Sequence, residues 1–187
     1  LIPYNPVKAI GLYRRAATKH FSDAGYAALQ AAFGYIFHIG HLPLDWGLIA
    51  DLTHIAATKE RFMFSLPYIG YMRIHGLGVT KNIRFGVQSL TRVLDEEKRA
   101  LEEEDRVLFY DITRALTRVA LGYAYEKGYI TGKPDLDTAV AYYEESHQYI
   151  LSHKANLDEE LKGIPIDDEA EERLAAFEEV DGHWRYK

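Results

Sequence analysis

Apolar residues recur at intervals of three and four along most of this chain, and polar residues fill the positions between them. Leu12, Ala16 and Ala17 fall on one side of a helix in the first segment, and Trp46 and Ile49 open a similar stripe further on. Because this spacing matches the turn of an α-helix, the pattern predicts helices throughout. The expected helices cover about 5–20, 23–39, 46–58, 65–75, a stretch within 87–121 that must reverse direction, 135–154 and 168–180.

Residues that cap helix N-termini stand before most of these segments. A short oxygen-bearing side chain accepts a hydrogen bond from a backbone N–H that the first helical turn leaves unpaired. Pro67 has no backbone N–H, so we expect it in the first turn of its helix. The expected caps are Ser22, Asp45, Ser65, Asn82, Asp135 and either Asp167 or Asp168.

The heptapeptide Gly-Tyr-x-x-x-x-Gly occurs three times, at 34–40, 70–76 and 122–128. Its first glycine lies inside an expected helix, where glycine costs about 1 kcal/mol against alanine. Because glycine recurs at this position despite its cost in a helix, we expect that it permits close approach of a neighbouring helix. For Gly34 we expect that neighbour to be the helix over 46–58. The second glycine is expected to end the helix in a left-handed conformation. These glycines are Gly34, Gly70 and Gly122, followed by Gly40, Gly76 and Gly128.

A second small residue follows each copy at nearly constant spacing. Ala50 and Gly86 stand at the eleventh position counted from the closing glycine, and Ala139 stands at the twelfth. We therefore expect each repeat to pair a first helix with a second helix that carries a small residue on its inner face. Ala9, in the first expected helix, holds the same position in a half unit that opens the chain, which is typical of a piece of a longer protein.

This combination resembles the Sel1-like repeat, a relative of the tetratricopeptide repeat. The resemblance covers roughly residues 5–150, and it implies an all-α, right-handed α-solenoid of antiparallel helix pairs that serves as a non-catalytic scaffold or adaptor for protein partners. The third copy carries the pattern most fully, through Leu121, Gly122, Tyr125, Gly128, Asp135, Ala139 and Tyr142.

The repeat spacing divides the chain into a solenoid over 1–155 and an acidic capping segment over 156–187. The first two copies stand 36 residues apart and the next two 52 apart, so a helical insertion is expected near 95–106. We expect it to project as a hairpin whose apolar strip, including Leu101 and Leu108, contacts a partner, unless that strip only joins its own two helices. The expected units are a half repeat at 5–20 and repeats at about 23–59, 65–95 and 107–154.

Charge and composition narrow the function classes. The 187 residues carry a net charge of −6. Eleven acids against two bases give −9 over 156–181, which leaves +3 for the rest of the chain. A chain without a concentrated basic stripe is a poor match for nucleic acid, so no nucleic-acid partner is expected. No apolar run is long enough for a membrane span.

Two missing features limit the chemistry and the compartment. The chain has no cysteine, which excludes disulfides and thiolate chemistry. It also has no Asn-x-Ser/Thr acceptor, which favours the cytoplasm or an organelle interior over a glycosylated compartment.

Candidate chemistry is sparse. His38 and His41, with His75 and Asp45, are the residues that a metal hypothesis would use, but they lie in different repeats and at different repeat positions. The acidic pairs of 102–105 and 169–172 are interpreted as solvated surface. We therefore expect no catalytic residues, no cofactor-binding residues and no metal ligands.

Three tyrosines, Tyr35, Tyr71 and Tyr123, share one repeat position directly after the first glycine. A shared position indicates either shared packing or an aromatic ladder that lines a groove for a peptide. The leading functional hypothesis is a protein-interaction scaffold within a larger protein or complex. An RNA-binding helical-repeat protein and a regulatory domain of a larger enzyme remain as alternatives.

Overall fold

The computed structural model of the chain describes residues 6–19, 23–36, 42–59, 62–102, 111–155 and 168–187. Within these ranges the chain forms eight helices and a final two-stranded antiparallel hairpin. The elements are α1 (Pro6–Ala17), α2 (Ala24–Ile36), α3 (Trp46–Thr58), α4 (Phe62–His75), α5 (Ile83–Glu102), α6 (Asp111–Glu126), α7 (Leu136–Ala155), α8 (Glu169–Leu174), β1 (Phe177–Val180) and β2 (His183–Tyr186).

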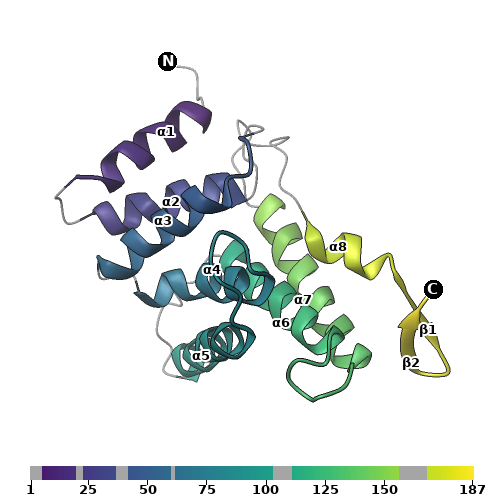
Figure 1. The fold of residues 1–187 in the computed structure, drawn as a ribbon. Helices are drawn as coiled ribbons and strands as arrows, with labels where there is room; N and C mark the ends of the chain where they lie inside the picture. Colours follow the sequence, from purple (N-terminus) through teal and green to yellow (C-terminus); the bar gives the residue numbers. More distant parts are fainter. Residues whose placement is uncertain (1–5, 20–22, 37–41, 60–61, 103–110, 156–167) are drawn as a thin grey trace.

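Helices that follow one another in the chain pack side by side as antiparallel pairs (Figure 1). The pairs are α1 with α2, α2 with α3, α4 with α5, and α6 with α7, and α4 also contacts α3 and α6. Helix α4 thus joins the pairs into one α-solenoid of helical repeats, as the sequence predicts. Helix α8 and the hairpin lie against α7, at the end of the solenoid away from α1.

Alanine gives α2 its close fit between its neighbours. Ala24, Ala28, Ala31 and Ala32 are fully buried, and short side chains let two flanking helices approach from different sides. One apolar cluster runs from α1 through α4 and on to α8 and β1, and a second joins α4, α5 and α6 around Leu90.

Glycine marks the crossing of the helices in two of the repeats. A Cβ on Gly70 would lie 2.5 Å from Cγ of Leu90 in α5, and a Cβ on Gly86 would lie 2.9 Å from the carbonyl oxygen of Gly70. In the next repeat a Cβ on Gly122 would lie 2.7 Å from the ring of Tyr143 in α7. These contacts confirm that the first glycine permits close approach of the second helix.

The prediction that Gly34 permits close approach of the helix over 46–58, which is α3, is wrong. A Cβ at this position would meet Ile10 of α1, at 2.6 Å from Cγ1, and no atom of α3 is among its nearest neighbours. The reason is that α2 lies between α1 and α3 and turns its glycine toward the preceding helix.

Glycine caps and polar caps end and begin the helices as expected. Gly76 and Gly128 have φ angles of 76° and 68°. The backbone N–H of Leu77, the residue after the first of these caps, donates to the carbonyl of Met72 at 3.0 Å, which is the Schellman pattern. Gly40, Ser22 and Asp167 lie outside the described residues. The side chains of Asp45, Asn82 and Asp135 accept from the backbone N–H three residues on, at 3.0, 3.0 and 3.1 Å.

Ser65 is not a cap, because α4 begins at Phe62. Ser65 is buried within the helix, and Pro67 lies beyond the first turn, where its ring is fully buried. The cost of a missing backbone donor inside a helix is offset by burial of the apolar segment around it, which sequence rules for caps do not weigh.

The C-terminal helix is shorter than expected. It ends at Leu174 rather than near 180, and 177–186 form the hairpin instead. Val180 pairs with His183 across Asp181 and Gly182, whose φ angles of 54° and 80° are those of a two-residue turn with both residues left-handed. The Asp-Gly dipeptide is the sequence signal for this turn.

The expected insertion falls between α5 and α6. Helix α5 has 20 residues against 13 for α3, and the described chain resumes after it at Asp111, the first residue of α6. Residue Leu108 and the side chain of Leu101 lie outside the described part of the chain, so the projecting hairpin and its partner contact stay predictions, as does the division into domains.

A buried ion pair holds the long helix α5 on its neighbours. Glu97 is 5 % exposed, and its Oε2 lies 2.7 Å from Nη1 of Arg118 in α6. Arg118 also reaches Glu145 of α7 at 3.2 Å, and its guanidinium lies 5.0 Å from the ring centroid of Tyr149. Burial of a charged pair without further partners would cost stability, so these side chains depend on one another.

Candidate interaction site

The three tyrosines of the shared repeat position do not have one role. Tyr35 is buried among α1, α2 and α3, with its hydroxyl 3.3 Å from Nη1 of Arg14. Tyr71 and Tyr123 instead lie on either side of His75, with ring centroids 4.5 and 4.4 Å from it. Tyr35 is therefore a packing residue of the core. Tyr71 and Tyr123 instead belong to a series of neighbouring aromatic rings.

Five rings form a continuous series that we call the aromatic row: Trp46, Tyr71, His75, Tyr123 and Tyr129. Trp46 stacks on Tyr71 at 5.8 Å, and Tyr123 meets Tyr129 edge to face at 6.1 Å. Helices α3, α4 and α6 and the loop after α6 supply the rings, so the row crosses the repeats rather than following one helix. Aromatic pairs at these separations attract each other beyond their simple burial.

A buried carboxylate, Glu126 at the end of α6, lies beside the row. It is 4 % exposed and accepts hydrogen bonds from the hydroxyls of Tyr143 at 2.6 Å and Tyr186 at 2.8 Å. Lys127 and Arg173 also pair with it, the arginine at 3.3 Å. Burial opposes its ionisation, but these donors and charges lower the pKa of Glu126 below its ordinary value. The site thus holds a stable negative charge.

The C-terminal segment, residues 168–187, lies on this surface. The guanidinium of Arg173 lies 4.6 Å from the ring centroid of Tyr123 and 5.7 Å from that of Tyr143. Its Nε and Nη2 donate to Oε1 of Glu169 at 2.8 and 2.7 Å, and the hydroxyl of Tyr71 donates to Oε2 of the same carboxylate at 2.7 Å. The expectation that this acidic run is solvated is wrong for Glu169 and holds for Glu172, which is exposed.

The hairpin has its own attachments to the solenoid. The backbone N–H of Trp184 donates to Oδ1 of Asp137 in α7 at 2.8 Å, and Nδ1 of His183 lies 3.0 Å from Oδ2. Phe177 is 3 % exposed and packs between Tyr143 and Tyr186, with centroids 6.2 and 4.9 Å away.

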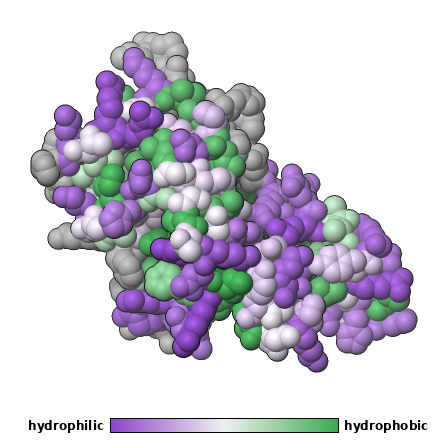
Figure 2. All heavy atoms as spheres, viewed as in Figure 1, coloured by the Kyte–Doolittle hydropathy of each residue, from purple (hydrophilic) through white to green (hydrophobic). Residues whose placement is uncertain are grey.

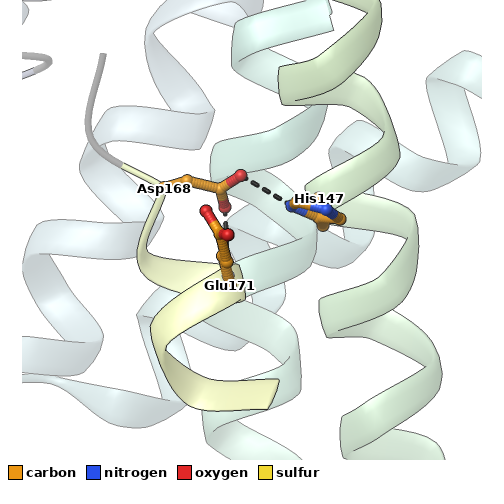
Figure 3. A group of neighbouring side chains, drawn as sticks. All are labelled: His147, Asp168 and Glu171. Atoms are coloured by element: carbon orange, nitrogen blue, oxygen red, sulfur yellow. Dashed lines mark hydrogen bonds and ion pairs between the residues drawn. The ribbon is translucent and has the colours of Figure 1, made fainter. Parts of the chain in front are cut away.

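His147 of α7 holds the start of α8 (Figure 3). Its Nδ1 lies 2.7 Å from Oδ2 of Asp168, while Oδ1 of the same carboxylate accepts the backbone N–H of Glu171 at 3.1 Å. The three side chains bring one ligand atom each within 4.8 Å of one another, which is close enough to share an ion. Because both oxygens of Asp168 already have partners, we interpret the group as the anchor of α8.

Of the residues considered as metal ligands, only His75 and Asp45 lie in the described part of the chain. His38 and His41 lie outside it, the carboxylate of Asp45 caps α3, and His75 belongs to the aromatic row.

Ionisation of His75 is disfavoured where it stands. Burial lowers its pKa to about 4, and the charges of Arg173 and Lys81 add to this effect, while Glu169 opposes it. Its Nε2 is buried and, among the described residues, has no hydrogen-bond partner. The imidazole is therefore neutral near pH 7 and acts as one more ring of the row.

A cavity of about 170 Å³ lies where α8 meets the repeats. Trp46 and Tyr71 line one part of it, Leu116 and Ile150 another, and Ala170 of α8 a third. Hydrophilic side chains predominate on the molecular surface around α8 and the hairpin in the view of Figure 2. Asp168, Glu169 and Glu172 also line the cavity, so its wall combines apolar and acidic side chains.

Sequence reasoning found two rings of this site and missed its charged residues. Glu126, Glu169 and Arg173 stand far apart in the chain and carry no repeated position. The only local signal is the four-residue spacing of Glu169 and Arg173, which is typical of a helical ion pair but says nothing about what the pair contacts.

The fold and the repeated glycine crossings place this chain among the α-solenoids of helical repeats. A family model described as Sel1 repeat matches residues 1–20, 68–88 and 113–146, and these three matches support a Sel1-like repeat family for this chain. The matched stretches include the second and third copies but not the copy at 34–40, whose glycine packs on the preceding helix. No curated protein and no solved structure matches the chain.

Sel1 repeats generally serve as protein-interaction scaffolds and are typically non-enzymatic, which supports an adaptor role with protein partners. In the described ranges, the helices are too short or too polar to cross a lipid bilayer.

Proposed function

We propose that this chain is a non-catalytic adaptor that binds a peptide segment of a partner protein along the aromatic row. The observation that carries the proposal is a series of five rings from three helices and the loop after α6, with Arg173 lying between Tyr123 of this series and the buried carboxylate of Glu126. Aromatic rings supply large contact areas at low entropic cost, and they are enriched where peptides and proteins bind.

The row has an accessible end at the loop after α6. Tyr129 is 38 % exposed and Ile130 is 36 % exposed, while the inner rings are half-buried. A partner segment that starts at this end can contact rings without opening the helix pairs. The acidic net charge of the chain favours a protein over RNA as this partner.

The double variant Tyr129→Ser/Ile130→Ser tests this proposal. Immobilised wild-type chain and variant are exposed to nuclease-treated extract, and the retained proteins are compared by mass spectrometry. We expect at least one protein to be retained by the wild type and lost from the variant. Leu151→Ser, which changes a side chain of similar exposure on α7 (43 %), is the matched control and should retain it.

Two results would contradict the proposal. One is an identical set of retained proteins on all three chains. The other is direct, submicromolar binding of RNA by the wild type at about 0.15 M salt, where an acidic surface binds RNA weakly.

A further inference from the structure

We propose that Glu126, Tyr123 and Tyr143 form an arginine-recognition site, that the chain's own Arg173 occupies it, and that the partner segment presents an arginine which replaces it. This inference rests on the proposed adaptor function and names the side chain of the partner that the adaptor recognises. The segment of the partner is a helical turn with a carboxylate four residues before the arginine, as in Glu169 and Arg173.

The receiving groups belong to the solenoid and not to the C-terminal segment. Glu126 and Tyr123 come from α6 and Tyr143 from α7, and a hydrogen bond of 2.6 Å joins the Tyr143 hydroxyl to the carboxylate. The rings face the guanidinium at 4.6 and 5.7 Å while the carboxylate pairs with its Nη1 at 3.3 Å. The planar arginine head uses stacking and directional donors at once, which the compact ammonium of lysine does not reproduce.

A second contact defines the carboxylate of the ligand. The Tyr71 hydroxyl donates to Oε2 of Glu169 at 2.7 Å, while Oε1 receives two donors from Arg173. The carboxylate therefore orients the arginine and meets the aromatic row at the same time. Two points one helical turn apart are recognised, so an isolated arginine without the preceding acid fits less well.

Helix α8, which carries Arg173, is held weakly enough for a partner segment to replace it. Helix α8 has six residues, too few to persist without the surface beneath it. Ala170 is its only fully buried side chain and Leu174 is partly buried against the core, while Glu169 and Arg173 contact the solenoid through hydrogen bonds and an ion pair, as in interfaces that form and separate. Because the occupant belongs to the same chain as the site, it competes at a high effective concentration and suppresses weak competitors.

The test is a binding measurement with a synthetic, fluorescein-labelled peptide of residues 166–187. Fluorescence anisotropy compares its affinity for the full wild-type chain and for the full chain with Arg173→Ala. We expect the Arg173→Ala chain to bind the peptide at least about tenfold more tightly, because its own segment competes less well. Circular dichroism checks that the variant keeps its helices, and Arg173→Lys serves in its place if it does not.

Peptide variants separate arginine recognition from general adhesion without altering the protein. A peptide with Arg173→Lys should bind the Arg173→Ala chain about tenfold less tightly than the parent peptide. A peptide with Glu178→Gln is the matched control and should bind as the parent does, because Glu178 contacts Arg185 within the hairpin.

Three outcomes would overturn the inference. Equal affinity of the wild-type and Arg173→Ala chains shows that the C-terminal segment is a permanent cap. Equal affinity of the parent and Arg173→Lys peptides for the Arg173→Ala chain shows that the site recognises positive charge and not arginine specifically. A wild-type dimer in sedimentation that Arg173→Ala abolishes assigns the site to a second copy of this chain. None of these depends on retaining a protein from extract, so failure here and failure of the adaptor proposal are distinguishable.

Discussion

Single side chains are decisive where the backbones of this protein come closest. Gly70 meets Gly86, and Gly122 meets Tyr143, at distances that leave no space for a methyl group. Elsewhere a glycine has room: at Gly11 of α1 an added Cβ would find no atom within 4 Å. The same residue type therefore has opposite consequences in different helices, and the difference lies in what faces it.

Gly122→Ala should lower the free energy of unfolding by about 1–3 kcal/mol, since the new methyl group displaces the Tyr143 ring. Gly11→Ala is the matched control, and it should raise stability by up to about 1 kcal/mol because alanine is the better helix former. Urea unfolding followed by circular dichroism measures both. A neutral effect at position 122 would show that α6 and α7 have room to move apart.

His75 makes stability depend on pH. Its pKa is about 4 in the folded chain against 6.5 for the free side chain, so the unfolded chain takes up the proton first as the pH falls. The contribution is therefore complete above about pH 6.5 and declines toward pH 4. We expect a loss of roughly 1–2 kcal/mol between pH 6.5 and 5, after allowance for solvent screening.

The variant His75→Phe should remove this loss while keeping a ring between Tyr71 and Tyr123. Urea unfolding at several pH values between 5 and 6.5 compares the two slopes. Parallel slopes for variant and wild type would mean that another group carries the dependence.

Secondary structure followed from local chemistry wherever one residue decides it. Asp45, Asn82 and Asp135 begin helices as their side chains predict, and Gly76 and Gly128 end them. Errors arose where tertiary contacts or a second local signal prevailed, as with a buried proline inside α4 and a hairpin at the C-terminus. The charged site could not be derived, because its members come from α6, α7 and α8 and meet only once the chain folds.

The turn of the C-terminal hairpin depends on Gly182. Its φ of 80° strains any residue with a side chain, and the strain is independent of space because no atom lies within 4 Å of an added Cβ. Gly182→Ala should destabilise the hairpin by about 1 kcal/mol and leave α1 to α5 unaffected. Hydrogen exchange should rise in 177–186, with Glu179→Ala, an exposed strand position, as control. Unchanged exchange would mean that the attachments to α7 alone hold the hairpin.

Contacts in a solenoid run mainly between neighbours, so the position of an element determines how far its loss spreads. Helix α4 contacts α3, α5 and α6, whereas α1 contacts α2 and α3. The C-terminal segment, with seven acids and three bases, contacts α4, α6 and α7. The two ends of the molecule therefore differ: α1 buries Ile10 and Ala17, whereas the C-terminal segment combines burial of Phe177 with hydrogen bonds and ion pairs.

This difference predicts how the protein unfolds. Met72→Ala, in α4, should lower the global free energy of unfolding by about 2–5 kcal/mol, because it leaves a cavity where three helices meet. Ile10→Ala removes a similarly buried side chain from α1 (6 % exposed), yet it should act locally, since a terminal helix can open while the pairs beyond it persist. Hydrogen exchange with mass spectrometry should then show faster exchange confined to 6–36 for Ile10→Ala and spread over the described helices for Met72→Ala. If both variants shift the urea midpoint equally, with exchange raised throughout, the solenoid unfolds as one unit and its ends have no independence.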